Sequence, residues 1–421
     1  MRYLPRRVAE EAKPAPAEEK PKEKKRRWPR RLAIGLAVTL VGVGGVWYGI
    51  HNIPGFGPAL ADGVRAVLGP SVVAWIEDTA YGIADDINVW RHKDDAPQTF
   101  WEVPASAQAS SSVEAPVALP VASASAQAPA NPSATWFPPA RFEPPFPGVA
   151  TPADGVWLEL PEGRRGDDPP LLVKGIVHPD KKRPFAAVAV VAMDLTRINL
   201  RLIAGTTEPH SEKISLAERP GLIPAADHAD LIAVFNGGFK ALHGQYGMML
   251  DGKIFLPPRD IACTVALYRD GTLRIRTWPN VSSTQSDMVA YRQTPPCLVE
   301  QGSLNDKLTE STKNWGATVS GETVIRRSAI GIDASGKTMF YALGEAVTAQ
   351  SLAKAMQAVG AVDAAQLDVN YAYPRFLFYD HPPAAERRAV MSLVPHVDYR
   401  SLDYVREPSP RDFFYVTRRN L

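Results

Sequence analysis

Short apolar runs alternate with turn residues from about Gly155 to the C-terminus. Each run has five to ten residues, and pairs such as Asp251-Gly252 and Asp270-Gly271 stand between neighbouring runs. This pattern is typical of β-strands that are joined by tight turns. It predicts strands at residues 156–160, 171–177, 186–193, 198–203, 231–235, 264–268, 273–278, 323–332 and 338–342.

One helix is expected within this region. Thr348 is a suitable N-cap, and Gly360 ends the pattern. The apolar positions that recur on one face of this helix are Leu352, Ala355, Met356 and Val359. A further strand is expected at residues 362–369. We therefore predict an α+β domain over residues 151–421, with a mixed β-sheet and few helices.

A different apolar segment lies near the N-terminus, where residues 32–50 contain no charged side chain. At a rise of 1.5 Å per residue, these residues would span roughly 28 Å as a helix, about the thickness of the hydrocarbon core of a bilayer. Residues 1–31 hold 12 Lys/Arg and 5 Glu. The positive-inside rule then places this basic tail in the cytoplasm and the C-terminal domain outside it. We expect a single-pass protein of the plasma or inner membrane.

A cleaved signal peptide is the alternative interpretation, because Ala59-Leu60-Ala61 offers a cleavage site. The apolar core of a signal peptide has only about 7–15 residues, which favours an uncleaved anchor. After the anchor we expect a juxtamembrane helical segment at 51–96, with an amphipathic helix at 71–91. A linker rich in Pro, Ala and Ser follows at 97–150.

Charge and composition exclude several functional classes. The whole chain carries a formal net charge of +2, but residues 32–421 hold 35 basic and 40 acidic residues. A domain with this balance is not a nucleic-acid binder. The eight histidines are scattered, and no zinc, P-loop or dinucleotide-binding motif is present. The sequence therefore indicates no metal site and identifies no cofactor.

The two cysteines, Cys263 and Cys297, fall in the domain that is predicted to lie outside the cytoplasm, where disulfides form. A disulfide between them and a pair of buried thiols both agree with the sequence.

Two segments in the middle of the domain contain candidate binding residues. Asn236, Gly237 and Gly238 directly follow an apolar run, where glycines permit positive φ angles and let a ligand approach the backbone. A turn without a ligand would use the same residues. His243 lies just downstream and could carry a proton, although an isolated histidine is more often structural.

Charged residues on apolar strands form the second group of candidates. Arg292 and Arg327 could each hold a phosphate, or else a carboxylate of the protein. Asp368 ends the strand after the helix and is a candidate nucleophile or general base. Asn370 and Tyr371 follow it directly and could contact a sugar.

Five short motifs in this order resemble the phosphodiester glycosidase family, whose hydrolases remove N-acetylglucosamine from a phosphodiester. The motifs are VFNGGF (234–239), GMMLDGK (247–253), RQTPPCLVEQG (292–302), RSAIGID (327–333) and AVDAAQLD (361–368). The chain departs from the family after Asp368. The family continues Leu-Asp-Gly-Gly-Gly-Ser. In this chain, Val369, Asn370 and Tyr371 follow Asp368, so residues with side chains stand where the family has glycines.

Together with the predicted anchor, the resemblance implies a membrane-anchored hydrolase that acts outside the cytoplasm on sugar-phosphodiester linkages in envelope glycans. Asp368 would then be catalytic and His243 a proton donor. Asn236, Gly237, Gly238, Arg292, Arg327, Asn370 and Tyr371 would bind the glycan or sugar-phosphate substrate. The alternative is a non-catalytic envelope protein that binds a glycan or a partner through the same fold.

Overall fold

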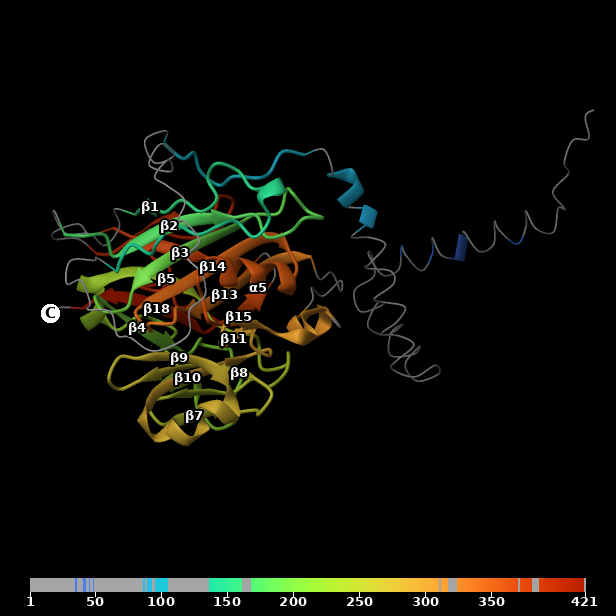
Figure 1. Ribbon diagram of the computed structural model, residues 1–421. Coiled ribbons are helices and arrows are strands. Elements are labelled where there is room, and N and C mark those ends of the chain that lie inside the picture. The colour runs from blue at the N-terminus through green and yellow to red at the C-terminus, as the bar shows by residue number, and fades with distance from the viewer. Residues whose placement is uncertain are drawn as a thin grey trace, which may run out of the picture. The chain divides into compact units, whose positions relative to one another are not determined.

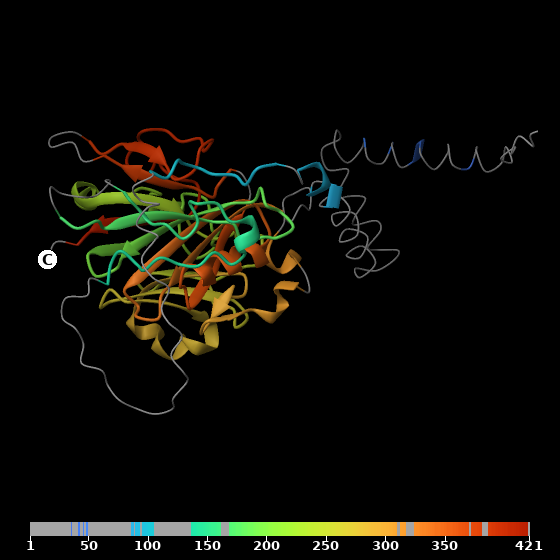
Figure 2. The same cartoon turned by 45° about the horizontal axis from the view of Figure 1, so that its top comes forward.

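The computed structural model of the 421-residue chain describes residues 95–104, 136–160, 168–309, 312–316, 324–369, 372–380 and 386–419. It also describes residues 35, 41, 42, 45, 48, 86, 87 and 89–92. The chain divides into two units, residues 1–77 and 78–421. Every strand described below belongs to the second unit, which is shown in Figures 1 and 2.

Three sheets make up the domain. The largest has the strand order β1-β2-β3-β14-β13-β15-β11-β12. Its strands are β1 (Leu158–Glu159), β2 (Leu172–Val177), β3 (Val188–Asp194), β11 (Val299–Glu300), β12 (Ser303–Leu304), β13 (Ile325–Ile332), β14 (Thr338–Val347) and β15 (Asp363–Val369).

The other two sheets have five strands each, in the orders β7-β6-β10-β8-β9 and β17-β16-β5-β18-β4. The first is built from β6 (Met248–Leu250), β7 (Lys253–Leu256), β8 (Cys263–Tyr268), β9 (Leu273–Thr277) and β10 (Met288–Thr294). The second is built from β4 (Ile198–Ile203), β5 (Leu231–Asn236), β16 (Phe376–Tyr379), β17 (Ala389–Ser392) and β18 (Phe413–Arg418).

Helices are few in the described part of the chain. The α-helix α5 (Ala349–Ala358) is capped by the Thr348 hydroxyl, which accepts a 3.0 Å hydrogen bond from the Ser351 N–H. This confirms the helix predicted before Gly360. The 3₁₀ turns are η1 (Pro147–Val149), η2 (Leu216–Glu218), η3 (Ala225–Asp230), η4 (Trp278–Asn280), η5 (Ser282–Asp287), η6 (Asp306–Thr309) and η7 (Thr312–Trp315).

The domain is mostly β with few helices, as predicted, but its sheets are not mixed. All pairs of the named strands are antiparallel. A strand–helix–strand order such as β14-α5-β15 usually joins parallel neighbours. Here β13 lies between β14 and β15 and pairs antiparallel with both. The two strands joined by α5 therefore run in the same direction without being neighbours.

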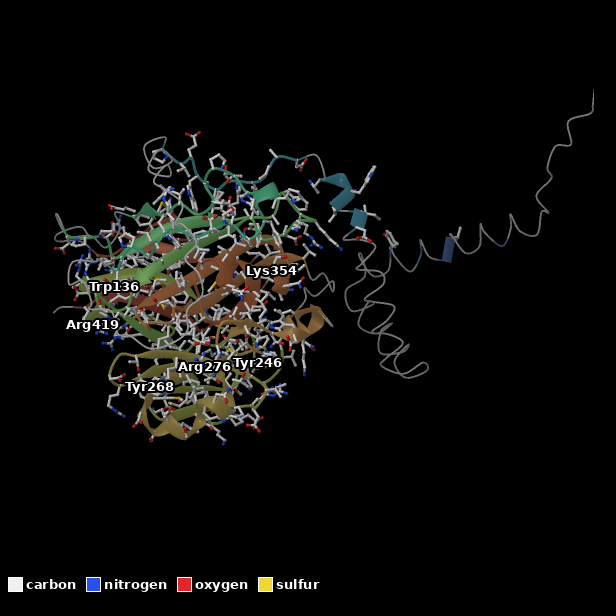
Figure 3. The ribbon with its side chains drawn as sticks, viewed as in Figure 1. Trp136, Tyr246, Tyr268, Arg276, Lys354 and Arg419 are labelled. Atoms are coloured by element: carbon white, nitrogen blue, oxygen red, sulfur yellow. A yellow bond between two sulfur atoms is a disulfide. The ribbon has the colours of Figure 1, made fainter. Side chains whose placement is uncertain are left out.

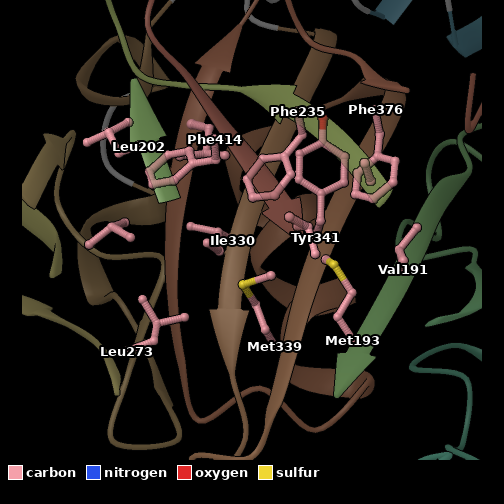
Figure 4. Packing of buried hydrophobic residues seen from close by; sticks show 14 of the residues in the cluster. Val191, Met193, Leu202, Phe235, Leu273, Ile330, Met339, Tyr341, Phe376 and Phe414 are labelled. Carbon is pink, nitrogen blue, oxygen red and sulfur yellow. The ribbon is translucent and has the colours of Figure 1, made fainter. Parts of the chain in front are cut away.

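The hydrophobic core lies on both faces of the large sheet, which is why β3, β13 and β15 are buried along their whole length. On one face, α5 contributes Leu352 and Met356 to a cluster with residues of β3 and β14. On the other face, all three sheets contribute to the largest cluster. Figure 4 shows part of it, with Phe235 of β5 next to Tyr341 of β14. Their ring centroids lie 4.9 Å apart.

The described parts of the predicted linker 97–150 pack on the domain at both ends. The carbonyl of Gln98 accepts a 2.9 Å hydrogen bond from Nε2 of His178, whose Nδ1 pairs with Asp154. The Lys174 ammonium group lies 4.5 Å from the ring centroid of Trp101. Phe137, at the other end, is buried in the cluster beside α5. Residues Gln98, Trp101 and Phe137 of the predicted linker are therefore in contact with the domain.

The predicted anchor at 32–50 lies almost wholly outside the described residues. Its described residues, Gly35, Val41, Gly42, Gly45 and Tyr48, are helical, as are residues 86, 87 and 89–91 of the predicted helix 71–91. Within the described part of the chain, no helix has the length and apolar character needed to cross a membrane.

Candidate functional site

A cavity of about 140 Å³ opens where the C-terminal ends of β5 and β15 meet the segment that leads into β18. The Asp368 N–H donates a 3.0 Å hydrogen bond to the carbonyl of Gly237, which joins the ends of two sheets at this point. The lining residues are Asn236, Gly237, Gly238, Asp368, Tyr373, Arg375, Asp403, Tyr404, Glu407, Pro408, Ser409, Pro410, Arg411 and Asp412. Pockets that bury drug-sized ligands have roughly 300–1,000 Å³, so this cavity suits one small group of a larger ligand.

Asp368 and Arg411 form an ion pair in the wall of this cavity. Nη2 of Arg411 donates to Oδ2 of Asp368 and, over 2.9 Å, to the carbonyl of Gly238. The other carboxylate oxygen of Asp368 accepts a 2.9 Å hydrogen bond from the Val369 N–H. The Arg411 guanidinium carbon lies 4.4 Å from the ring centroid of Tyr373. The cavity thus places a carboxylate, a cation and an aromatic ring side by side.

Burial and the two opposite charges shift the pKa values of Asp368 and Arg411. Burial raises the pKa of Asp368 to about 6, against the opposing effects of Arg411 and the Val369 N–H. Burial also disfavours the charged form of Arg411, but the carboxylates of Asp368 and Asp412 outweigh it and raise its pKa. At neutral pH, Asp368 is therefore an ionised carboxylate that gains a proton within the physiological range.

Gly237 and Gly238 are required by close packing and not by positive φ angles, which the structure does not give them. A Cβ atom on Gly237 would lie 2.6 Å from the carbonyl oxygen of Asp412. One on Gly238 would lie 2.8 Å from Cζ of Arg292. Asp412 and Arg292 of the protein itself therefore approach the backbone here, and both glycines also line the cavity.

Arg292 lies behind the cavity wall and does not line it. Its Nε donates a 2.8 Å hydrogen bond to Oδ2 of Asp412, and both side chains are fully buried. Nη1 donates to the carbonyls of Tyr246 and Gln293 at 3.0 and 2.9 Å, and Nη2 donates to the carbonyl of Phe239. The sequence-based role of holding a ligand therefore does not fit Arg292.

Arg327 is also fully buried and lies away from the cavity lining. Its Nη1 donates to the carbonyl of Trp315 at 2.6 Å and to Oε1 of Gln366 at 2.9 Å. Nη2 donates to the carbonyl of Gly316 at 2.9 Å. Burial lowers the pKa of Arg327 to about 9. This arginine holds the segment around Trp315 against β13 and β15, and it too is not placed to meet a substrate.

Asn236 lines the cavity, but its amide is occupied by the protein. Nδ2 donates a 2.9 Å hydrogen bond to the hydroxyl of Ser328, which in turn donates a 3.0 Å hydrogen bond to the carbonyl of Asp368. Oδ1 accepts from the Tyr341 hydroxyl at 2.8 Å and from the Arg375 N–H at 3.2 Å. Asn236 therefore fixes the end of β15, and with it the backbone of Asp368.

His243 is exposed and is not part of the cavity lining. Partial burial and the positive charges of Lys240 and Arg411 lower its pKa, against the effect of Glu208. The imidazole is consequently neutral at pH 7 and a poor proton donor there. Asn370 and Tyr371 lie outside the described residues. In the part of the chain that the structure describes, no group of three potential metal ligands occurs.

Part of the chain that forms this site is similar to a known protein family. Residues 229–368 match the model of the phosphodiester glycosidase family. The chain contains a phosphodiester glycosidase family domain.

The similarity to solved structures is low. The catalytic domain of zebrafish N-acetylglucosamine-1-phosphodiester α-N-acetylglucosaminidase, auto-inhibited by its pro-peptide, is 15% identical, with a TM-score of 0.37. The match covers 61% of this chain and 87% of that one. A hypothetical protein from Synechocystis is 12% identical with a TM-score of 0.36, covering 61% and 65%. No curated protein matches the chain.

The phosphodiester glycosidase motif ends at Asp368, and the chain then departs from the glycine-rich continuation of the family. The first substituted position does not fill the cavity. Val369 is 4% exposed, packs against Phe239 and Ile325 and is not among the residues that line the cavity. Tyr246, labelled in Figure 3, packs against Phe239 with ring centroids 6.1 Å apart. A side chain at position 369 is therefore compatible with an open site.

Most of the residues that line the cavity lie beyond the matched span of the phosphodiester glycosidase model. Tyr373, Arg375 and the residues from Asp403 to Asp412 follow residue 368. Sequence analysis missed Arg411 and Asp412. The available signal was a charged pair directly before the apolar FFYV run, since β18 begins at Phe413.

Proposed function

We propose that this protein is an outward-facing, membrane-anchored hydrolase that cleaves the bond between a sugar and a phosphodiester in envelope glycans. The family domain supports glycosidase chemistry. The predicted anchor supports the location, as does the Cys263–Cys297 disulfide, a bond that persists in oxidising compartments.

The observation that carries the proposal is the Asp368–Arg411 pair at the cavity. A buried carboxylate with a raised pKa, next to a cation in a concave site, is the arrangement expected of a catalytic group. Tyr373 lies against Arg411 and offers an aromatic face on which a sugar ring can stack. The free cavity volume suits the phosphate group, with the remainder of the glycan outside it.

In the proposed reaction, Arg411 binds the phosphate oxygens through charge-assisted hydrogen bonds and releases Asp368 from the ion pair. Asp368 then acts at the anomeric carbon, either as the nucleophile or as the base that deprotonates the attacking water. The bond between the anomeric carbon and the phosphate oxygen breaks, and its electron pair stays on the phosphate. Water supplies OH to the sugar, and the phosphate leaves as a monoester. Arg411 stabilises the charge that develops on it.

The test is hydrolysis of a glycosyl phosphodiester by the purified full-length chain in detergent. We expect Asp368→Asn and Arg411→Met each to lower kcat/KM by at least about 100-fold, as loss of a catalytic or charge-stabilising group does. Asp154→Asn is the matched control, because Asp154 is a buried, paired carboxylate that does not line the cavity. Full activity of Asp368→Asn would overturn the proposal. Glycan binding without turnover in the wild type would favour the non-catalytic alternative.

A further inference from the structure

Two buried ion pairs lie next to each other at the cavity, and both include residues that line it. Arg411 pairs with Asp368, and the next residue in the chain, Asp412, pairs with Arg292. The second pair is completely enclosed, with 0% exposure of both side chains. Burying two charges is costly, and an apolar pair of similar volume often stabilises a fold equally well or better. Stability alone is therefore a weak reason for an ion pair at this position.

Asp412 holds together the chain segments that form the cavity. Its Oδ2 accepts hydrogen bonds from Nε of Arg292 and from the Gly238 N–H, both 2.8 Å long. Its carbonyl accepts a 3.0 Å hydrogen bond from the Gly237 N–H. Because Arg411 precedes Asp412 directly and donates to the Gly238 carbonyl, these contacts fix Arg411 from both sides.

Arg292 extends this support to the loop after β5. Its guanidinium group reaches the carbonyls of Phe239 and Tyr246, at the two ends of a loop that includes His243. A planar guanidinium can serve a carboxylate and several carbonyls at once, which an ammonium group cannot do with the same geometry. One buried side chain thus connects β10, the end of β5 and the start of β18.

We propose that the Arg292–Asp412 pair positions Arg411 for binding the phosphate and sets the charge around Asp368. The inference deepens the proposed function and rests on it. Asp412 and Arg292 are positioning residues, because both side chains are fully buried in their own ion pair, although Asp412 belongs to the cavity lining. Arg411 can leave Asp368 for a phosphate without losing its own place, because Asp412 and Gly238 hold its backbone and side chain.

The charge of Asp412 also affects the protonation of Asp368. The charge of Asp412 raises the pKa of Asp368, in addition to the larger effect of burial. The other charged groups that face Asp412 are Arg292, Arg411 and the buried Arg219. Neutralising Asp412 therefore leaves an excess of positive charge around Asp368, which lowers its pKa.

The test compares Asp412→Asn with the wild-type full-length chain on a glycosyl phosphodiester. Misplacement of a binding group by about 1 Å can cost about 100-fold in rate, so we expect kcat/KM to fall on this scale, mainly through KM. The acidic limb of the pH profile should move to lower pH. Asp154→Asn, which removes a buried charge elsewhere, should change neither property.

A second variant covers the case in which Asp412→Asn fails to fold. Arg292→Gln combined with Asp412→Asn removes both charges and leaves no unpaired ion, so it is expected to fold and still to show the raised KM. A wild-type KM in either folded variant, or a wild-type pH profile in Asp412→Asn, would overturn the inference, while the proposed function would stand. If the wild type shows no turnover, a carbon-13 titration of the Asp368 carboxyl decides the inference separately. An unchanged pKa in Asp412→Asn would then overturn it.

Discussion

Reduction of the Cys263–Cys297 disulfide should destabilise the domain by a predictable amount. The bond joins the start of β8 to the segment between β10 and β11, so it ties one five-stranded sheet to the large sheet. Both cysteines are buried, at 0% and 2% exposure. The bond closes a loop with a sequence separation of 34 residues. For a loop of this size, loop-closure entropy corresponds to about 4 kcal/mol at 25 °C.

This free energy converts into a measurable change in melting temperature. For domains of about this size, 1 kcal/mol corresponds to roughly 2–4 °C, so the Tm of the domain should fall by about 8–16 °C on reduction. The assay is thermal unfolding of the full-length chain followed by circular dichroism, with and without reductant. Because the chain has only two cysteines, thiol titration of the denatured protein should give none before reduction and two after it.

The Cys263→Ala, Cys297→Ala double variant serves as the control. It should melt near the reduced wild type and should not respond to reductant. A reduced wild type that melts within about 2 °C of the oxidised protein would refute the loop-entropy reasoning. Free thiols in the protein isolated from its native membrane without reductant would argue against the proposed location of the domain.

Three further predictions address the site and its support. Activity should rise with pH through about 6, because Asp368 must lose its proton to act and burial raises its pKa to about 6; a flat profile between pH 5 and 7 would contradict this role. Gly237→Ala should destabilise the domain by about 1–3 kcal/mol in denaturant titrations, since its Cβ would crowd the Asp412 carbonyl, while Gly148→Ala, with open space, should have little effect. Trp101→Ala should cost about 1–2 kcal/mol in the same assay, because this partly buried ring packs on the domain core and under Lys174; wild-type stability would show that the docking of residues 98–101 contributes nothing.

Hydrophobic patterning was sufficient to locate most of the central elements. The predicted strand at 198–203 coincides with β4, and the predicted helix corresponds to α5 with its Thr348 cap. These elements have local signals, because alternating or continuous apolar residues and a capping hydroxyl act within a few residues of one another. The order of the strands has no such signal. That β13 inserts between β14 and β15, and makes the sheet antiparallel, depends on long-range packing.

The sequence alone identified the family motifs, the glycine pair, the apolar anchor candidate and Asp368 as the most interesting carboxylate. It could not assign the arginines, since a buried Arg292 and a substrate-binding arginine look alike along the chain. Only the tertiary structure brought Arg411, 43 residues further on, onto Asp368. It also placed Asp412 against Gly237. The physical reason is that the role of a buried charged side chain depends on the group it pairs with. Partners from distant strands come into contact only when the sheets pack together.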